Sequence, residues 1–464
     1  MRSPVRIREA ARGRLFDKAF LQKAIIGEFP ERSNGADCKS VGSAFEGSNP
    51  PLPIVFLSAC LLLLFWEEIM DKEYILKHKE HPVLLFKLND DFELSEMGEV
   101  FDSKRLPFGL KYEGNKNAQY KQLSDWIENR GLPKSRSDLV YINKDTNTRN
   151  SVELCFGSYA LNLTDQYWAH GTNEDLCWEK SNFFDNPFGN IIDFDTNGTY
   201  KESRHIRVAP DLTVDGSLRK KWIIDKKTNI RFLLKGSRYD EMQEPFNEVI
   251  AGKIMELFGI EHVEYGLIRN KSNNMPLCYC ECMVDRDTEY MTAQYVKDSE
   301  LRENRNEYGR LIDICEKNGI NGARQEIDKM IVLDYIMGNT DRHTGNFGII
   351  RNAGSLKWLN VAKIFDNGNS LCHETKDIGD MENYVDSYSR WFNNTNFENL
   401  KYIEFPEWYS QSSANKIIDI VDACLADNER ISSKKKEKLV KIVGLRIKGL
   451  EQFLNDRLPS RRLP

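Results

Sequence analysis

Hydrophobic and polar residues alternate along this chain with two different periods, and the period changes near residue 290. After Met70 a strand-like alternation predicts a small antiparallel sheet; it involves Tyr74, Leu76, Val83, Leu85 and Phe86. Residues 206–285 predict a twisted sheet that carries one helix, and the pattern beyond residue 290 is largely helical. The order of these segments predicts an α+β chain in which a sheet-rich part precedes a helical part.

Individual elements can be placed within this pattern. Residues 230–235, 263–268 and 277–283 predict strands, and Pro245 is expected to open the intervening helix, since proline suits the first helical position. An apolar stripe follows on that helix, formed by Phe246, Val249, Ile250, Ile254 and Leu257. Further helices are expected near residues 120–130 and over 324–337, 414–427 and 433–455, the last capped by Ser432 or Ser433. Residues 151–200 predict loops and short elements.

Composition narrows the class of protein. Of 464 residues, 40% are hydrophobic and 29% charged, which is typical of a soluble globular protein. The net charge of -6 argues against a protein built mainly to bind nucleic acid. The 10 cysteines are mostly scattered singly, which favours a reducing, cytoplasmic compartment. Cys278, Cys280 and Cys282 would share one face of a strand; a zinc site is one interpretation, but no second ligand pair follows and buried strand residues are favoured.

The first 69 residues show no pattern that connects them to the rest. Residues 52–66 form an apolar run of about 15 residues, shorter than the about 20 that a membrane span needs, and a signal peptide would start earlier. Back-translation of residues 47–50 matches the T-arm of a transfer RNA, and residues 37–40 match a tyrosine anticodon loop. We therefore expect residues 1–69 to be a disordered extension that is translated by accident from a tRNA gene. The natural start would then be Met70. A true anchor or signal is the alternative.

The strongest chemical pattern runs from Gly338 to Ile350, G-N-T-D-R-H-T-G-N-F-G-I-I. Asp341 and Asn346 lie five residues apart, and Asp366 follows twenty residues after Asn346. Phosphoryl transfer needs a carboxylate that accepts the proton of the incoming hydroxyl, and oxygen ligands that hold Mg²⁺ against phosphates. The spacing equals that of the catalytic loop H-R-D-x-x-x-x-N.

Two upstream residues complete this constellation. Lys235 ends an apolar strand, where a lysine can bind phosphates, and Glu248 lies 13 residues on, where it can hold that lysine. Each residue alone has a simpler interpretation. Asp341 could cap a helix or turn, Lys235 and Glu248 could be solvated, and His343 could be a structural hydrogen-bonding group rather than a ligand contact. The joint order and spacing favour the catalytic interpretation.

Another motif imitates the start of a calcium loop, with Asp193, Asp195, Asn197 and Gly198. The final position of such a loop needs a carboxylate but holds Arg204. A hairpin turn is favoured there.

The sequence from Met70 to the C-terminus resembles the bacterial HipA-like serine/threonine kinases, particularly the branch found in clostridia-like bacteria. Besides the loop above, the resemblance includes L-P-K-S-R (132–136), P-D-L-T-V-D-G (210–216) and Q-E-P-F-N-E-V-I-A (243–251). It implies a two-lobed protein-kinase-like fold with an additional N-terminal subdomain. The corresponding segments would be an N-terminal subdomain over 70–205, a β-rich N-lobe over 206–285 and a helical C-lobe over 286–464.

The resemblance also implies roles for particular residues, with ATP and Mg²⁺ bound between the lobes. Asp341 would be the catalytic aspartate, with Lys235, Glu248 and His343 completing the catalytic set, and Asn346 and Asp366 would be the Mg²⁺ ligands. Nucleotide-binding residues would be Lys235, Lys220, Gly216, Glu281 and Met283, the last two at the adenine hinge. The family's autophosphorylated S-V-A-G loop resembles residues 213–216, with Thr213 in place of the serine; the change leaves self-regulation open.

Other functions compete with this one. Phosphoinositide-type lipid kinases share D-R-H-x-x-N and I-D-N-G, but the only basic run is Lys434-Lys435-Lys436, which also suits a solvated helix start. A non-catalytic pseudokinase or toxin–antitoxin interaction module is a further alternative. The expected partners are a protein substrate of unknown identity and a small DNA-binding, antitoxin-like protein. Direct nucleic-acid binding is not expected, nor membrane binding if residues 1–69 are spurious.

Overall fold

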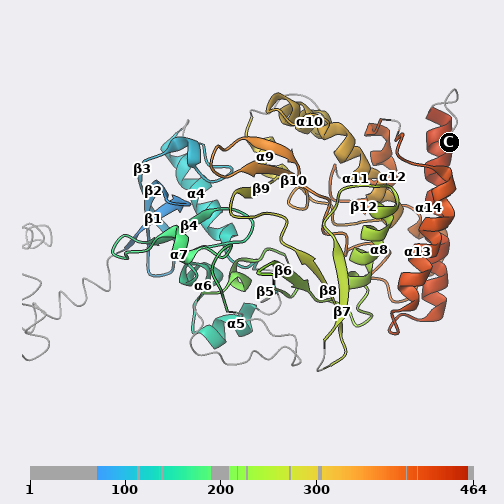
Figure 1. Cartoon of the computed structure of the whole chain (residues 1–464), viewed down its shortest axis with the longest axis horizontal. Coiled ribbons are helices and arrows are strands. Elements are labelled where there is room, and N and C mark those ends of the chain that lie inside the picture. Colours follow the sequence, from blue (N-terminus) through green and yellow to red (C-terminus); the bar gives the residue numbers. More distant parts are fainter. Residues whose placement is uncertain are drawn as a thin grey trace, which may run out of the picture. The chain divides into compact units, whose positions relative to one another are not determined.

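The computed structural model describes residues 71–111, 115–134, 136, 139–189, 208–216, 218–225, 228–270, 273–300, 306–392, 394–404 and 406–457. The segment 1–69 and the calcium-loop-like residues 193–204 lie outside these ranges, so both interpretations stay predictions. The described part combines four sheets with helices that gather towards the C-terminus (Figure 1). The α+β, two-lobed fold class predicted from the sequence is confirmed, whereas the predicted segment boundaries stay an interpretation.

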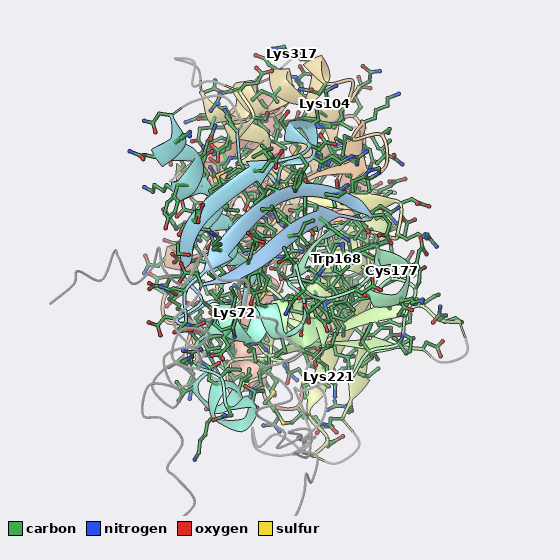
Figure 2. All side chains as sticks on the ribbon, turned by 90° about the vertical axis from the view of Figure 1, so that its left-hand side faces the viewer. Lys72, Lys104, Trp168, Cys177, Lys221 and Lys317 are labelled. Atoms are coloured by element: carbon green, nitrogen blue, oxygen red, sulfur yellow. The ribbon has the colours of Figure 1, made fainter. Side chains whose placement is uncertain are left out.

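The first sheet is antiparallel, with strand order β3-β2-β1-β4. Its strands are β1 (Lys72–His78), β2 (His81–Leu88), β3 (Leu94–Val100) and β4 (Tyr167–Gly171). One face is buried because alternate positions such as Leu84, Phe86 and Leu88 are apolar. Figure 2 turns this sheet towards the viewer, with Trp168 of β4 beside it. Four helices accompany the sheet, namely α4 (Lys116–Arg130), α5 (Leu139–Thr146), α6 (Ser151–Gly157) and α7 (Trp178–Ser181).

The second sheet has the order β5-β6-β8-β7. It comprises β5 (Lys220–Ile224), β6 (Arg231–Lys235), β7 (Tyr265–Arg269) and β8 (Pro276–Glu281). Helix α8 (Glu244–Leu257) connects β6 to β7 and starts with Pro245 in its first turn, as the sequence predicted. In the antiparallel β5–β6 pair, Lys220 lies directly opposite Lys235. Two lysines that are 15 residues apart in the sequence are therefore cross-strand neighbours.

Helices dominate the remainder, as predicted. They are α9 (Ala293–Asp298), α10 (Glu307–Lys317), α11 (Ala323–Met337), α12 (Asn396–Asn399), α13 (Ala414–Ala426) and α14 (Ser433–Arg457). Strands β9 (Thr288–Thr292), β10 (Gly348–Asn352) and β11 (Trp358–Val361) form a third sheet, and β12 (Tyr388–Ser389) and β13 (Asn394–Thr395) a short hairpin. The largest apolar core joins α8, α10, α11, α13 and α14. Ser432 caps α14, since its hydroxyl accepts a hydrogen bond from the Lys435 backbone N–H.

A buried polar network joins the first sheet to the third. Glu289 of β9 is fully buried, accepts from His78 of β1 at 3.0 Å and pairs with Arg351 of β10 at 2.5 Å. Burial alone would raise the pKa of Glu289, but the hydrogen bond from His78 and the charge of Arg351 lower it. Arg351 also donates to the Tyr167 hydroxyl. This network fixes β1 and β4 against β9 and β10, and β10 lies between Asn346 and Asp366 in the sequence.

Two expectations concern membranes and metals. Among the helices that the structure describes, none is long and apolar enough to cross a membrane. Within the same residues there is no group of three or more His, Cys, Asp or Glu side chains that could hold a metal ion, and Cys278 and Cys280 are buried, free strand residues.

Candidate active site

Lys235 lies at the centre of a buried ionic cluster that joins the sheet-rich and helical parts. Its Nζ donates to Glu248 Oε1 of α8 at 2.8 Å and to Asp366 Oδ1 at 2.8 Å. The Tyr265 hydroxyl of β7 accepts a third hydrogen bond at 3.1 Å. Lys235 and Glu248 are almost completely buried, and Asp366 is partly exposed. Three residues that the sequence linked only by order and spacing are therefore in direct contact.

The charges in this cluster shift one another's pKa values. Burial alone would lower the pKa of Lys235, but Asp366 and then Glu248 outweigh burial and hold it well above the usual range. Burial likewise acts to raise the pKa of Asp366, yet Lys235 and then Lys220 hold it far below its usual value. Burial raises the pKa of Glu248, with Lys235 acting against it. Lys235 and Asp366 are therefore charged at neutral pH.

A second lysine extends this positive region. Lys220 is buried opposite Lys235, and its Nζ donates to the Asp215 carbonyl oxygen at 3.1 Å. Gly216 has a φ of +97°, and a Cβ there would collide with Lys220 Nζ. Glycine is thus favoured by the backbone conformation, and a side chain there would displace the Lys220 ammonium. Together, the turn and the two lysines form a compact cationic region suited to phosphate.

The candidate catalytic loop begins where α11 ends at Gly338, whose φ of +61° is left-handed. Asp341 accepts from Arg390 Nη1 at its Oδ1, 2.6 Å away, and from Asn369 Nδ2 at its Oδ2, 2.7 Å away. Asn346 Nδ2 donates to the Asp341 carbonyl oxygen at 3.0 Å. Because this bond uses the amide nitrogen, Asn346 Oδ1 is left as an acceptor that receives no hydrogen bond from the described residues.

Arg342 connects this loop to the segment that carries Asp366. It is buried and forms two hydrogen bonds to Asp334 of α11, at 2.9 and 3.0 Å. The same guanidinium donates to the carbonyl oxygens of Asn346 and Phe365 and to Asn367 Oδ1. Such a rigid fork of donors suits arginine. The sequence motif contained Arg342, but its role as a connecting group was missed, because only the fold brings its acceptors together.

The backbone around Asp366 is held in an unusual conformation. Asp366 has a φ of +57°, in the left-handed region that costs about 1–3 kcal/mol for a non-glycine residue. The next backbone N–H, of Asn367, donates to Glu248 Oε2 at 2.7 Å, and Asn247 Nδ2 donates to the Gly368 carbonyl oxygen at 2.8 Å. Glu248 thus holds both Lys235 and the Asp366 segment. Strain of this kind often occurs at functional sites.

The remaining predicted site residues differ in how far their side chains are exposed to solvent. His343 Nδ1 accepts from the Gly345 backbone N–H at 3.1 Å, which supports its structural interpretation as part of the loop. Glu281 ends β8 with an exposed side chain, and Met283 is partly buried against an apolar cluster. Thr213 is buried, and its hydroxyl donates to the Leu161 carbonyl oxygen at 2.8 Å. In this conformation the Thr213 hydroxyl is not accessible to a phosphate donor.

The residues present fit Mg²⁺ and a nucleotide. Mg²⁺ prefers oxygen ligands and is usually held by one or two carboxylates together with substrate phosphates and water. Asp366 supplies a carboxylate of low pKa, and Asn346 Oδ1 supplies an amide oxygen that no described group occupies. Lys235 and Lys220 supply cations that would bind the phosphates, beside a turn in which Gly216 adopts a left-handed conformation.

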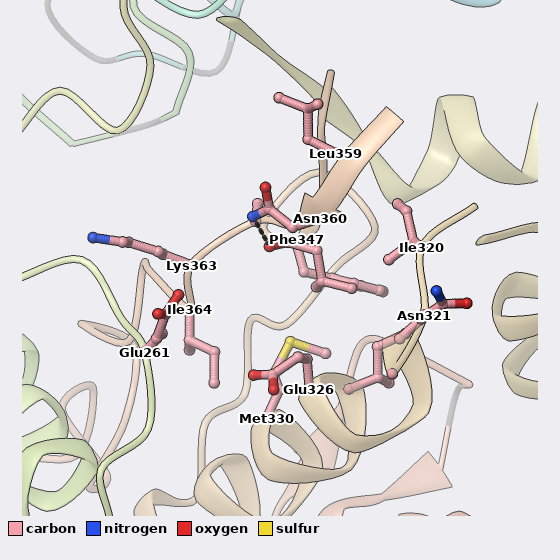
Figure 3. Close-up of a pocket in the computed structure, with 15 residues that line it drawn as sticks. Glu261, Ile320, Asn321, Glu326, Met330, Phe347, Leu359, Asn360, Lys363 and Ile364 are labelled. Atoms are coloured by element: carbon pink, nitrogen blue, oxygen red, sulfur yellow. Dashed lines mark hydrogen bonds between the residues drawn. The ribbon is translucent and has the colours of Figure 1, made fainter. Parts of the chain in front are cut away.

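A separate cavity of about 290 Å³ lies beside this site (Figure 3). It is lined by Glu261, residues 320–323, Glu326, Ile327, Met330, Phe347 and residues 359–364. None of the predicted site residues lines it. Phe347 and Ile364 nevertheless belong to the two segments that carry Asn346 and Asp366.

Comparison with known proteins tests the resemblance to HipA-like kinases. No protein-family model matches the chain. Over 140 residues the chain is 29% identical to the serine/threonine-protein kinase CtkA of Helicobacter pylori (strain J99 / ATCC 700824). The matched stretch covers 29% of this chain and 42% of CtkA. The chain thus spans less than half the length of this curated relative.

Two solved structures are also similar. The Helicobacter pylori proinflammatory kinase CtkA matches with a TM-score of 0.38 and 16% identity, over 51% of this chain and 94% of that chain. The HipA structure of the Shewanella oneidensis MR-1 toxin–antitoxin system, a complex with HipB and operator DNA, matches with a TM-score of 0.50 and 11% identity, over 84% of this chain and 100% of that chain. The predicted resemblance is therefore confirmed at two levels: the sequence is similar to a serine/threonine-protein kinase over 140 residues, and the fold is similar to HipA.

Proposed function

We propose that the chain is a serine/threonine protein kinase of the HipA-like type, which transfers the γ-phosphate of ATP with the help of Mg²⁺. The observation that carries this proposal is the contact of Lys235 with both Glu248 and Asp366. In protein kinases a strand lysine, a helix glutamate and a metal-binding aspartate must be in place together for transfer. The similarity of a 140-residue stretch to a serine/threonine-protein kinase points to the same chemistry.

Each residue has a definite task in this reaction. Lys235 and Lys220 would bind the nucleotide phosphates. Asn346 and Asp366 would hold Mg²⁺, which would neutralise charge on those phosphates when bound. Asp341 orients the acceptor hydroxyl and accepts its proton as the oxygen bonds to the γ-phosphorus. The bond from that phosphorus to the bridging oxygen breaks, and ADP leaves with the electron pair. Catalysis rests on positioning and electrostatics.

The partner expectation also belongs to this proposal. HipA of Shewanella oneidensis MR-1 was solved together with HipB and its operator DNA. A small antitoxin-like protein that binds DNA is the corresponding partner proposed for this chain. Co-purification of the native protein with a product of a neighbouring gene tests this expectation.

Radiolabelled ATP tests the class of acceptor. The full chain is incubated with γ-labelled ATP, Mg²⁺, a protein extract from its own host and vesicles that contain phosphoinositides. Label in protein serine or threonine supports the proposal. Label in phosphoinositides alone would show the lipid-kinase alternative to be correct, and ATP binding without transfer to any acceptor would indicate a binding module.

A further inference from the structure

The carboxylate of Asp341 has both oxygens occupied by donors from two different downstream segments. Arg390 binds Oδ1 at 2.6 Å and Asn369 binds Oδ2 at 2.7 Å. The Arg390 side chain is 56% exposed and that of Asp341 25% exposed, so this ion pair lies at the mouth of the site. An acceptor hydroxyl that approaches Asp341 would therefore meet the Arg390 guanidinium.

Arg390 is held beside the catalytic loop by its neighbours. Ser389 pairs with Asn394 in the β12–β13 hairpin, and Trp391 is buried. The Trp391 ring contacts the ring of Phe347, with centroids 4.4 Å apart, and Phe347 directly follows Asn346. Burial alternates along this segment, so that Tyr388 and Arg390 are exposed while Ser389 and Trp391 are buried. The guanidinium and an exposed aromatic ring thus share the outer face of the hairpin.

The ion pair between Arg390 and Asp341 can be replaced at little cost by a pair between Arg390 and another anion. Exposed pairs of this kind contribute about 0–1 kcal/mol, so an incoming anion can compete for Arg390 at little cost. An acceptor hydroxyl that hydrogen-bonds to Asp341 Oδ1 would take the place of the guanidinium there, and the arginine would then need a new counter-ion. The nucleotide phosphates already have Lys235 and Lys220, both buried on the sheet side of the site. The acceptor is the remaining source of negative charge.

We propose that Arg390 is a specificity residue that binds an acidic group of the acceptor, so that this site prefers a serine or threonine flanked by Asp or Glu. The inference rests on the proposed protein-kinase function and adds the substrate class. On binding, the acidic side chain of the acceptor takes over the guanidinium from Asp341, and Asp341 Oδ1 becomes free to accept the hydroxyl proton. Tyr388 provides an apolar surface for the acceptor backbone on the same face.

A degenerate peptide library tests this preference. Serine- and threonine-containing peptides carry Glu, Gln or Lys at the flanking positions, and kcat/KM is measured for each set. Wild type is expected to favour Glu over Gln by about tenfold, as for a charge-assisted hydrogen bond. Arg390→Gln should remove the preference, and Arg390→Glu should reverse it in favour of Lys. Arg149→Glu is the matched control, because Arg149 is 52% exposed and paired with Glu153, far from the catalytic loop; it should keep the wild-type preference.

The outcomes separate the two levels of the proposal. Equal rates for all peptides with wild type, or a uniform fall or a uniform rise in rate with Arg390→Glu, would each overturn the inference while leaving the kinase function intact. A uniform fall would place Arg390 on the transferring phosphoryl group, and a uniform rise would make it a shield of Asp341. Failure of folded wild type to label any peptide or protein would instead contradict the proposed function.

Discussion

Removal of Lys235 should leave two carboxylates in a buried cluster without their cation. In the wild type, Lys235 Nζ is 2.8 Å from an oxygen of Glu248 and 2.8 Å from an oxygen of Asp366. Loss of one partner from a buried ion pair typically costs about 3–5 kcal/mol. We therefore expect Lys235→Ala to lower the free energy of unfolding by an amount in this range at neutral pH, and to abolish Mg-ATP binding.

The size of this effect should depend on pH, because Glu248 can be neutralised by a proton. Protonation of a carboxyl with an ordinary pKa of 4.5 costs about 3.4 kcal/mol at pH 7 and about 0.7 kcal/mol at pH 5, at 1.36 kcal/mol per unit. Without Lys235, burial raises the pKa of Glu248 in the folded state still further above its unfolded value. A carboxyl whose pKa is higher in the folded than in the unfolded state favours folding fully at pH values below its unfolded pKa. This contribution to the free energy of unfolding is lost as pH rises through the folded pKa. The variant should therefore be closer to wild type at pH 5 than at pH 7, by up to about 2.7 kcal/mol.

Urea unfolding followed by tryptophan fluorescence measures this difference at the two pH values. Lys435→Ala is the control, because Lys435 is equally buried and pairs with Glu241 at 2.5 Å, away from the nucleotide site. It should destabilise the protein without loss of Mg-ATP binding, and with a weaker pH dependence because Glu241 is partly exposed. A destabilisation by Lys235→Ala that is equal at both pH values, or larger at pH 5, would refute the reasoning.

Two further substitutions test the metal ligand and the connecting arginine. Asp366→Ala should weaken binding of Mg-ATP far more than of ATP alone, because it removes the carboxylate that would hold the metal; calorimetric titrations that leave the ratio of the two affinities unchanged would contradict this assignment. Arg342→Lys should lower the free energy of unfolding by about 1–3 kcal/mol and abolish transfer, because a single ammonium cannot replace the hydrogen bonds to Asp334, Asn346, Phe365 and Asn367. Wild-type stability in urea for Arg342→Lys would show that these bonds are not needed.

Much of the fold could be predicted because the apolar pattern is strong. The predicted strand 230–235 and helices 324–337, 414–427 and 433–455 agree with the structure to within two residues at each end. Order and spacing were also sufficient to select Lys235, Glu248 and Asp366, which the structure brings into contact. Local sequence was enough for these residues, since Lys235 ends a strand, Glu248 lies on a regular helix and Asp366 lies at a fixed spacing from Asn346.

The rest of the site depends on contacts between distant segments, which no local pattern reports. Arg390 lies 49 residues after Asp341 and reaches it only because the β12–β13 hairpin folds back, anchored by Trp391. Asn369 and Tyr265 were missed for the same reason. The burial of the Thr213 hydroxyl also could not be predicted from the sequence, because it depends on packing beside Leu161, 52 residues upstream. The motifs alone therefore selected the residues of the Lys235 cluster but not the groups that surround Asp341.

Transfer by the Asp341→Asn variant tests the central claim most directly. Asparagine keeps the size of the side chain but cannot accept a proton, so nucleotide binding should be nearly unchanged. Single-turnover transfer from γ-labelled ATP to the preferred acceptor, measured with folded wild type and variant side by side, should fall by about 100- to 10,000-fold. Equal transfer rates for the two proteins would contradict the claim that Asp341 receives the hydroxyl proton and that this chain is a kinase built on Lys235, Asp341 and Asp366.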